Sequence, residues 1–169
     1  MKIGLVSLGC DKNRIDSENM LAYLQKDGYE LTGDPQQAEI IIVNTCGFID
    51  SAKQEAIDTI LEMSEYKKDK CRFLVVTGCL AQRYMQDIAD EFPEVDMILG
   101  TANYHNMPLY IKNLVDGKGQ RCYANDKDDR HFSSERVLTT PYHYAYLKIA
   151  EGCDNKCTYC AIPGIRGKY

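Results

Sequence analysis

Three features are missing from this sequence of 169 residues, and each absence excludes a class of protein. No apolar run approaches the roughly 20 residues that a membrane-spanning helix needs, so we expect no membrane partner. Basic residues are not in excess: the net charge is −5 and the pI is near 5.2, which argues against a broad nucleic-acid surface. The chain also has no convincing secretion signal, because the apolar stretch after Met1 is short and charged residues follow it.

Without a secretion signal, the eight cysteines are expected to lie in a reducing cytoplasm and to serve as ligands instead of forming disulfides. The remaining composition is 44% hydrophobic and 27% charged. That balance is typical of a globular chain with one sizeable core and the beginning of a second.

Four short apolar segments indicate buried strands, namely residues 2–8, 39–45, 73–77 and 95–99. Near-continuous apolar runs are typical of parallel strands covered by helices on both faces. Helical patterns lie between or after them, at residues 16–26, 51–66, 81–92 and 107–116. We therefore predict an α/β fold with an open, mainly parallel, flavodoxin-like sheet that has helices on both faces.

The composition changes after residue 117, and this change predicts the domain organisation. Residues 1–118 are expected to form the α/β domain, and the highly charged residues 119–136 a linker with one short strand at 121–124. A second domain is expected to open over residues 137–169, with its first strand at 142–150. One strand and one loop cannot bury a core, so we expect the chain to be a piece of a longer protein.

Near the end of the sequence, Cys153, Cys157 and Cys160 are spaced C-x3-C-x2-C. Three thiolates this close in sequence can surround one metal centre, and soft sulfur ligands favour zinc or iron–sulfur clusters. Most iron–sulfur clusters take four cysteines, so a set of three leaves one iron open. An open coordination position is typical of a catalytic metal site.

A second set of cysteines follows three of the predicted strands: Cys10, Cys46 and Cys79. They are separated by 35 and then 32 residues, close to the length of one strand–helix–strand unit. Carboxyl ends of parallel strands meet at one edge of the sheet, and neighbouring strands lie about 4.8 Å apart. The spacing therefore predicts that these three thiols converge on a second cluster.

Other residues are weaker candidates. Cys71 and Cys122 do not follow a strand in this way, and we interpret them as structural. Four polar residues near the second set can orient hydrogen bonds to a cluster, although two of them equally suit a helix start: Asn13, Asp16, Ser17 and Asn44. Arg166 and Lys168 can meet a carboxylate or simply be solvated.

With both cysteine sets in place, the sequence resembles the methylthiotransferase family of radical S-adenosylmethionine enzymes over essentially its whole length. Residues 7–13 (SLGCDKN) and 16–18 (DSE) are similar to the branch that modifies an aspartate of a small-subunit ribosomal protein, as are residues 152–169. Asp11 departs from that branch, which commonly has proline there. The branch that modifies transfer RNA typically has phenylalanine before the glycine and Gln-Met-Asn after the cysteine.

The resemblance implies two [4Fe-4S] clusters and S-adenosyl-L-methionine as cofactors. Cys153, Cys157 and Cys160 would hold the radical cluster, whose open iron binds S-adenosylmethionine, with Tyr159 near the adenine. Cys10, Cys46 and Cys79 would hold the auxiliary cluster, which presents sulfur to the substrate. The implied reaction adds a methylthio group to the β-carbon of an aspartate, with the ribosomal protein as substrate and a flavodoxin or ferredoxin as electron donor.

Residues 137–169 would be the first strand and cluster loop of a truncated (β/α) barrel, and the chain alone is expected to be inactive. No catalytic side chain is assigned, and the chain itself requires no nucleic acid.

Alternatives remain open at this point. The chain can be a zinc-binding interaction module, which would have to recruit Cys122 or His143 as a fourth ligand. It can also be a flavodoxin-like binding domain with incidental cysteines. Within the enzyme family, a transfer-RNA methylthiotransferase is the second choice.

Overall fold

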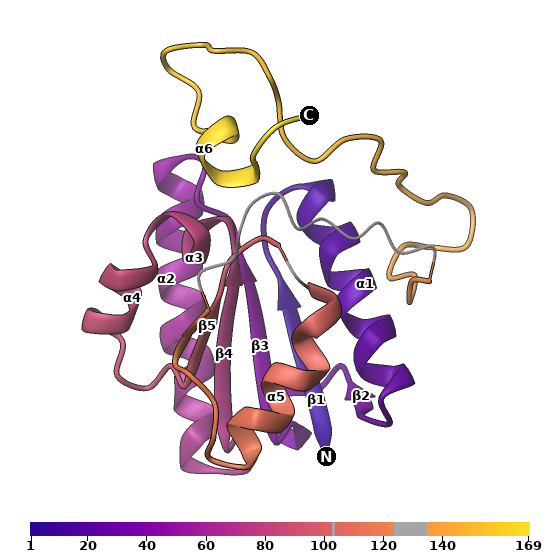
Figure 1. Cartoon of the computed structure of the whole chain (residues 1–169). Coiled ribbons are helices and arrows are strands. Elements are labelled where there is room, and N and C mark those ends of the chain that lie inside the picture. The colour runs from indigo at the N-terminus through magenta and orange to yellow at the C-terminus, as the bar shows by residue number, and fades with distance from the viewer. Residues whose placement is uncertain (103, 124–134) are drawn as a thin grey trace.

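A computed structural model describes residues 1–102, 104–123 and 135–169. Its centre is a six-stranded sheet in which every neighbouring pair is parallel (Figure 1). The strand order is β2-β1-β3-β4-β5-β6, so the chain direction across the sheet reverses between β1 and β3. The strands are β1 (Lys2–Ser7), β2 (Glu30–Thr32), β3 (Ile40–Thr45), β4 (Phe73–Gly78), β5 (Met97–Leu99) and β6 (Cys122–Tyr123).

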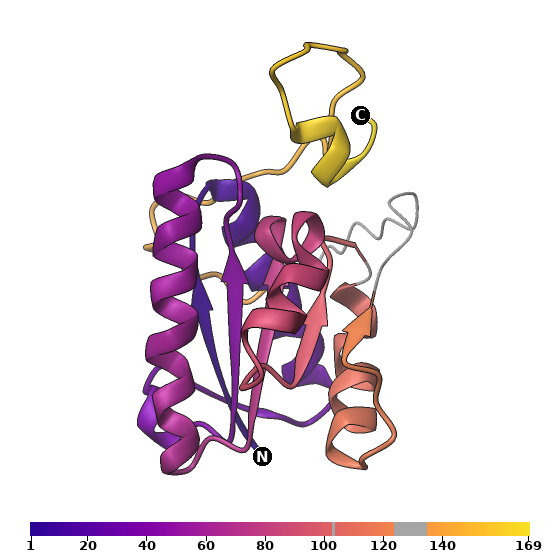
Figure 2. The same cartoon turned by 90° about the vertical axis from the view of Figure 1, so that its left-hand side faces the viewer.

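Helices cover both faces of the sheet, as predicted (Figures 1 and 2). One apolar layer packs β-strand side chains such as Ile42 against α1 (Asp11–Lys26) and α5 (Met107–Val115). The opposite layer packs side chains such as Ile41 against α2 (Asp50–Glu65), α3 (Cys79–Arg83) and α4 (Met85–Glu91). Both faces of β3 are fully buried, which explains why its sequence is apolar without alternation.

Two predicted helices differ from the structure in their extent, and one strand was not predicted. Helix α1 begins at Asp11, five residues before the predicted start, because its first turns bury polar side chains that hydrophobic periodicity does not detect. The helix predicted over residues 81–92 is two helices that meet at Tyr84. Strand β2 was missed because its three residues are exposed or half-buried and form no apolar run. The short strand predicted at 121–124 is β6, although residue 124 lies outside the described residues.

The prediction of a strand over residues 142–150 is wrong: these residues form no strand in the structure. A barrel strand needs hydrogen-bonded neighbours, and among the described residues none pairs with this segment. Instead, residues 135–161 run as an irregular segment that is anchored on α1. Glu18 accepts hydrogen bonds from the Thr139 amide and hydroxyl, at 2.8 and 2.9 Å.

The segment ends in the short helix α6 (Ile162–Arg166), which lies above the carboxyl ends of the strands and packs against α3 (Figures 1 and 2). Three 3-10 turns complete the structure: η1 (Pro35–Gln37), η2 (Tyr66–Lys68) and η3 (Tyr104–Asn106). Through the described part of the chain, no helix has the length and apolar character needed to cross a membrane.

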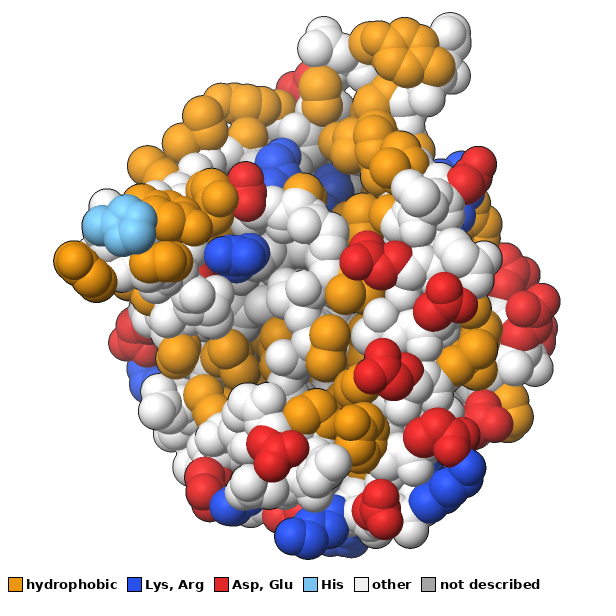
Figure 3. Space-filling view, turned by 180° about the vertical axis from the view of Figure 1, so that it is seen from behind, with side chains coloured by type: hydrophobic (Ala, Val, Ile, Leu, Met, Phe, Trp, Pro, Cys, Tyr) orange, Lys and Arg blue, Asp and Glu red, His pale blue; other side chains and the backbone are white. Residues whose placement is uncertain are grey.

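Hydrophobic side chains are exposed mainly along the carboxyl-terminal segment, at the upper end of the molecule in the view from behind (Figure 3). They include Tyr142, Leu147, Ile149 and Tyr159. Lower on the same face, acidic and basic groups are interspersed with smaller apolar patches. The surface above the strand ends therefore differs in character from the rest of the molecule.

Candidate functional site

The three strand-end cysteines lie on neighbouring strands. Cys10 directly precedes α1 after β1, Cys46 follows β3, and Cys79 opens α3 after β4. Strands β1, β3 and β4 are adjacent in the sheet. Thr45 is in register with Gly78, so Cys46 and Cys79 leave the sheet at the same level.

Gly9 allows the first two cysteine turns to approach each other closely. A Cβ atom added to Gly9 would lie 2.6 Å from the Cys46 Cβ and 3.0 Å from its Sγ. Gly9 also has a φ of 87°, in the left-handed region that favours glycine. The glycine before Cys10 therefore has two separate reasons to lack a side chain.

Asn13 connects all three cysteine-bearing strand ends. Its Nδ2 donates hydrogen bonds to the backbone carbonyls of Leu8, at 3.0 Å, and Thr45, at 2.9 Å. These carbonyls lie just before Gly9-Cys10 and Cys46, respectively. Its Oδ1 lies 3.6 Å from Cys79 Sγ, which donates to it. Asn13 is fully buried, so it acts from inside the site.

Cys79 is the most buried of the three strand-end cysteines. Burial raises the pKa of its thiol, and the neighbouring Cys46 and Cys10 act in the same direction. The Arg166 guanidinium opposes them and lowers the pKa of Cys79 by its charge and by a hydrogen bond. A buried cation beside this thiol favours the thiolate that a metal ligand requires.

Four charged residues, three buried and one partly buried, tie the carboxyl-terminal segment to the carboxyl edge of the sheet. We call Asp16, Lys148, Glu151 and Arg166 the charge square. Lys148 Nζ lies 2.6 Å from both Asp16 Oδ1 and Glu151 Oε2, and Arg166 Nη1 lies 2.6 Å from Asp16 Oδ2. Arg166 Nη1 also donates to Glu151 Oε1. Each cation thus contacts each carboxylate, and the square is neutral as a whole.

The charges of the square are strongly shielded from solvent. Burial would lower the pKa of Lys148, but Asp16 and Glu151 outweigh it and raise that pKa. Burial would raise the pKa of Glu151, but Lys148 and Arg166 hold it below its ordinary value. Both groups therefore remain ionised, as a paired buried charge requires.

The second cysteine set lies on a loop that starts and ends at this square. The amides of Gly152 and Cys153 donate to the carbonyls of Lys168 and Gly167, both at 3.1 Å, which closes the loop at its base. Cys153 and Cys160 are half-buried, whereas Cys157 is exposed. Tyr159, predicted near a cofactor, projects into solvent.

Several sequence candidates have structural partners instead. Asn44 Nδ2 donates to the Asn13 carbonyl and to Ser17 Oγ, both at 2.9 Å, and Ser17 donates to Ser7 Oγ at 2.8 Å. These bonds hold the amino-terminal part of α1 against β1 and β3. The Cys71 thiol is buried and donates to the Phe73 carbonyl, and Cys122 is half-buried in β6. Within 1–102, 104–123 and 135–169, no three His, Cys, Asp or Glu side chains are placed to hold a single metal ion.

Sequence reasoning missed three residues of the site: Tyr104, Lys148 and Glu151. Burial raises the pKa of Tyr104 well above its ordinary value, and Asp16 acts in the same direction. Its hydroxyl is buried and has no hydrogen-bond partner among the described residues. The sequence held one signal for Lys148 and Glu151, because a cation stands three residues before an anion next to a cysteine motif. Nothing in the sequence indicated that Asp16 is their partner.

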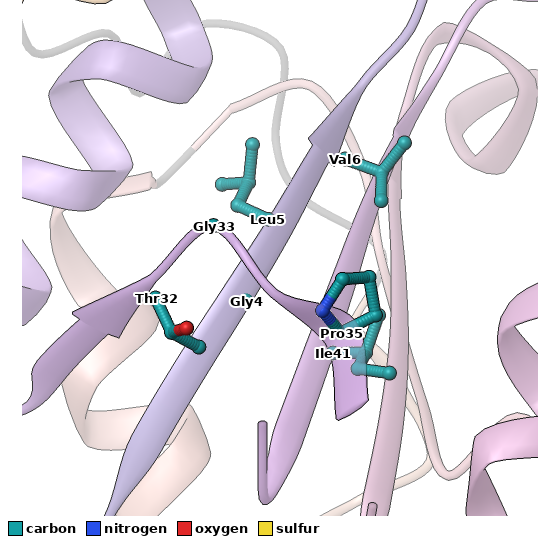
Figure 4. A pocket seen from close by; sticks show the side chains of 7 residues that line it. All are labelled: Gly4, Leu5, Val6, Thr32, Gly33, Pro35 and Ile41. Carbon is teal, nitrogen blue, oxygen red and sulfur yellow. The ribbon is translucent and has the colours of Figure 1, made fainter. Parts of the chain in front are cut away.

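A small cavity elsewhere is not part of this site. It has a volume of about 40 Å³ and lies beside β1, beneath the turn that leads from β2 to β3 (Figure 4). Its lining is aliphatic or backbone apart from Thr32, whose hydroxyl accepts from the Asp34 amide at 3.1 Å. No titratable side chain lines it, so it offers no chemistry.

The sequence is similar to known proteins. The model of the family described as "Uncharacterized protein family UPF0004" matches residues 2–100, which include all three strand-end cysteines. Two similar curated proteins are both named ribosomal protein uS12 methylthiotransferase RimO. The one from Clostridium tetani is 56% identical over 169 residues, and the one from Caldicellulosiruptor saccharolyticus is 53% identical over 171.

Each alignment covers 100% of this chain but only 38% and 39% of the relative. The resemblance to methylthiotransferases is confirmed by these relatives, and it extends beyond the span of the family model. Because the family model matches more than half of the chain's residues, the chain belongs to the UPF0004 family.

Proposed function

We propose that this chain supplies the two cysteine sites of a radical S-adenosylmethionine methylthiotransferase that acts on ribosomal protein uS12. The observation that carries the proposal is that Cys10, Cys46 and Cys79 follow three adjacent strands at the same edge of the sheet. The names of the similar proteins support the substrate. The modified position would be the β-carbon of an aspartate in uS12.

The residues present fit an iron–sulfur group. Three soft thiol donors follow adjacent strands, and the missing side chain of Gly9 leaves the Cys10 and Cys46 turns in close approach. Cys10, Cys46 and Cys79 would hold an auxiliary [4Fe-4S] cluster, and Cys153, Cys157 and Cys160 the radical cluster, with Tyr159 beside the adenine of S-adenosylmethionine. When bound, these groups supply the radical and the sulfur chemistry. The chain itself would bind, orient and shield them.

The same proposal covers the organisation of the chain. Residues 1–118 would be a flavodoxin-like domain, which the strand order β2-β1-β3-β4-β5 supports, because ligands bind where that order reverses. Residues 119–136 would be the linker, and 137–169 the start of the radical domain. The site lies at the carboxyl edge next to the reversal between β1 and β3. A flavodoxin or ferredoxin would donate the electron, and the enzyme would work in the cytoplasm.

The test replaces the matching segment of the Clostridium tetani relative with this chain. The chimera is expressed in cells that lack the activity, and uS12 and transfer RNA are analysed by mass spectrometry. We expect one methylthio group on uS12, none on transfer RNA, and loss of the product in Cys10→Ser and Cys153→Ser chimeras. Methylthiolated transfer RNA would select the other branch of the family. Stable zinc without iron in the chimera would favour the zinc-binding interaction module. Unchanged product in both serine variants would refute the roles of these cysteines.

A further inference from the structure

We propose that Arg166 is a positioning residue for the site of Cys10, Cys46 and Cys79, through which the segment carrying the other three cysteines completes that site. The inference rests on the proposed function for the identity of the bound group. It goes further because Arg166 belongs to neither cysteine set and lies 87 residues after Cys79 in the sequence.

The connection runs through Asn13. Arg166 Nη2 donates to Asn13 Oδ1, the same oxygen that accepts from Cys79 Sγ. The other end of the Asn13 carboxamide donates to the Leu8 and Thr45 carbonyls. One guanidinium nitrogen therefore fixes the orientation of a side chain that contacts all three cysteine-bearing strand ends.

Arginine suits this role because of its shape as well as its charge. Its planar fork presents several N–H donors in fixed directions, and in this site Nη1 is directed to Asp16 and Glu151 while Nη2 is directed to Asn13. The side chain is 2% exposed, so water does not compete for these bonds. A lysine could keep the charge but not hold three acceptors in one plane.

α6 has one further anchor outside the charge square. The hydroxyl of Thr101, in the loop after β5, donates to the Ile165 carbonyl at 3.0 Å, and Ile165 is buried. The backbone on the amino-terminal side of Arg166 is thus held against the strand ends. The docking of the carboxyl-terminal segment therefore places Arg166 where it can orient Asn13.

Lys148 provides the matched control. It is partly buried and contacts the same two carboxylates as Arg166, but its ammonium group contacts Asp16 and Glu151 and not Asn13. Arg166→Gln and Lys148→Gln each remove one positive charge from the square. Only the first removes the hydrogen bond to the Asn13 carboxamide.

The experiment uses the full 169-residue chain with Cys153, Cys157 and Cys160 changed to serine, so that only one cluster is counted. Four proteins are reconstituted anaerobically with iron and sulfide: this background, and the background with Arg166→Gln, Arg166→Lys or Lys148→Gln. Three properties are measured: the rate of iron loss to a chelator, the electron paramagnetic resonance spectrum of the reduced cluster, and its midpoint potential. Removal of a nearby positive charge should make the potential more negative.

We expect Arg166→Gln to lose iron at least five-fold faster than Lys148→Gln and to change the electron paramagnetic resonance spectrum. Arg166→Lys should bring the midpoint potential closer to that of the background than it brings the rate of iron loss. An Asn13→Ala variant should also lose iron at least five-fold faster than Lys148→Gln. Adding Arg166→Gln to it should cause little further iron loss, since Arg166 holds the iron through Asn13. Equal iron loss in Arg166→Gln and Lys148→Gln would overturn the proposal, because the square would then be only a scaffold. Failure of the unmodified background to load iron would refute the proposed function instead.

Discussion

Lys148 Nζ lies 2.6 Å from Asp16 Oδ1, although 132 residues separate them in sequence. This ion pair is one side of the charge square that seats the carboxyl-terminal segment on α1. Because the pair is buried, its loss leaves a charge without compensation, and a change at either residue affects much more than one contact.

Asp16→Asn should therefore release the segment from the strand ends. The substitution leaves two buried cations with one carboxylate, which we expect to cost on the order of 3 kcal/mol of docking free energy. Hydrogen exchange at the Gly152 and Cys153 amides, which close the loop, should become faster. The control is Asp50→Asn, which breaks the solvent-exposed pair between Asp50 and Lys53 and should leave these amides unchanged. Equal exchange in both variants would show that the square does not hold the segment.

Gly9→Ala should damage the three-cysteine site more than an equivalent change elsewhere. Gly9 and Gly28 both have positive φ, at 87° and 91°. An added Cβ at Gly9 would meet Cys46, whereas nothing lies within 4 Å at Gly28. Both alanine variants should lose about 1–2 kcal/mol of unfolding free energy through backbone strain. Only Gly9→Ala should also lose most of its iron, measured per chain after reconstitution. Normal loading in Gly9→Ala would mean that the two cysteine turns need not approach closely.

Cys71 predicts a pH dependence of stability. Burial raises the pKa of its thiol above the ordinary value. Below the ordinary pKa of about 8.5, both the folded and the unfolded chain keep the proton, and the full stability is present. As the pH rises from there through the folded-state pKa, the unfolded chain loses its proton first, so stability falls.

The test compares the metal-free, reduced wild-type chain with Cys71→Ala by urea unfolding between about pH 8 and about pH 10. The variant should be less stable at every pH but should decline less steeply. It should still load as much iron as the wild type, because Cys71 is not a ligand in this account. A steeper decline in the variant would contradict the buried thiol, and lost iron would contradict its structural role.

The positions of the strand-end cysteines could be predicted from sequence because two regular features coincide. Apolar runs mark β1, β3 and β4, and parallel strands necessarily end at one edge. The start of α1 could not be predicted in this way. Its first two turns bury the polar residues Asn13, Asp16 and Ser17 and only one apolar residue, Ile15, so this part of the helix lacks the apolar stripe that identifies a helix.

The charge square was beyond sequence reasoning for a different reason. Asp16, Lys148 and Arg166 are ordinary charged residues, and such residues are usually solvated. Only the docking of the carboxyl-terminal segment makes them buried partners. The same docking explains why the predicted strand at 142–150 is absent, since the segment is held by side-chain bonds to Glu18 and Asp16 instead of by a backbone ladder.

The central claim is that Cys10, Cys46 and Cys79 hold a cluster by themselves. The most direct measurement is iron and sulfide per chain after anaerobic reconstitution, in the chain with Cys153, Cys157 and Cys160 changed to serine and in a variant that also carries serine at the three strand ends. The account predicts about four irons and about four sulfides in the first protein and essentially none in the second. Equal iron in both proteins, or zinc alone in the first, would contradict it.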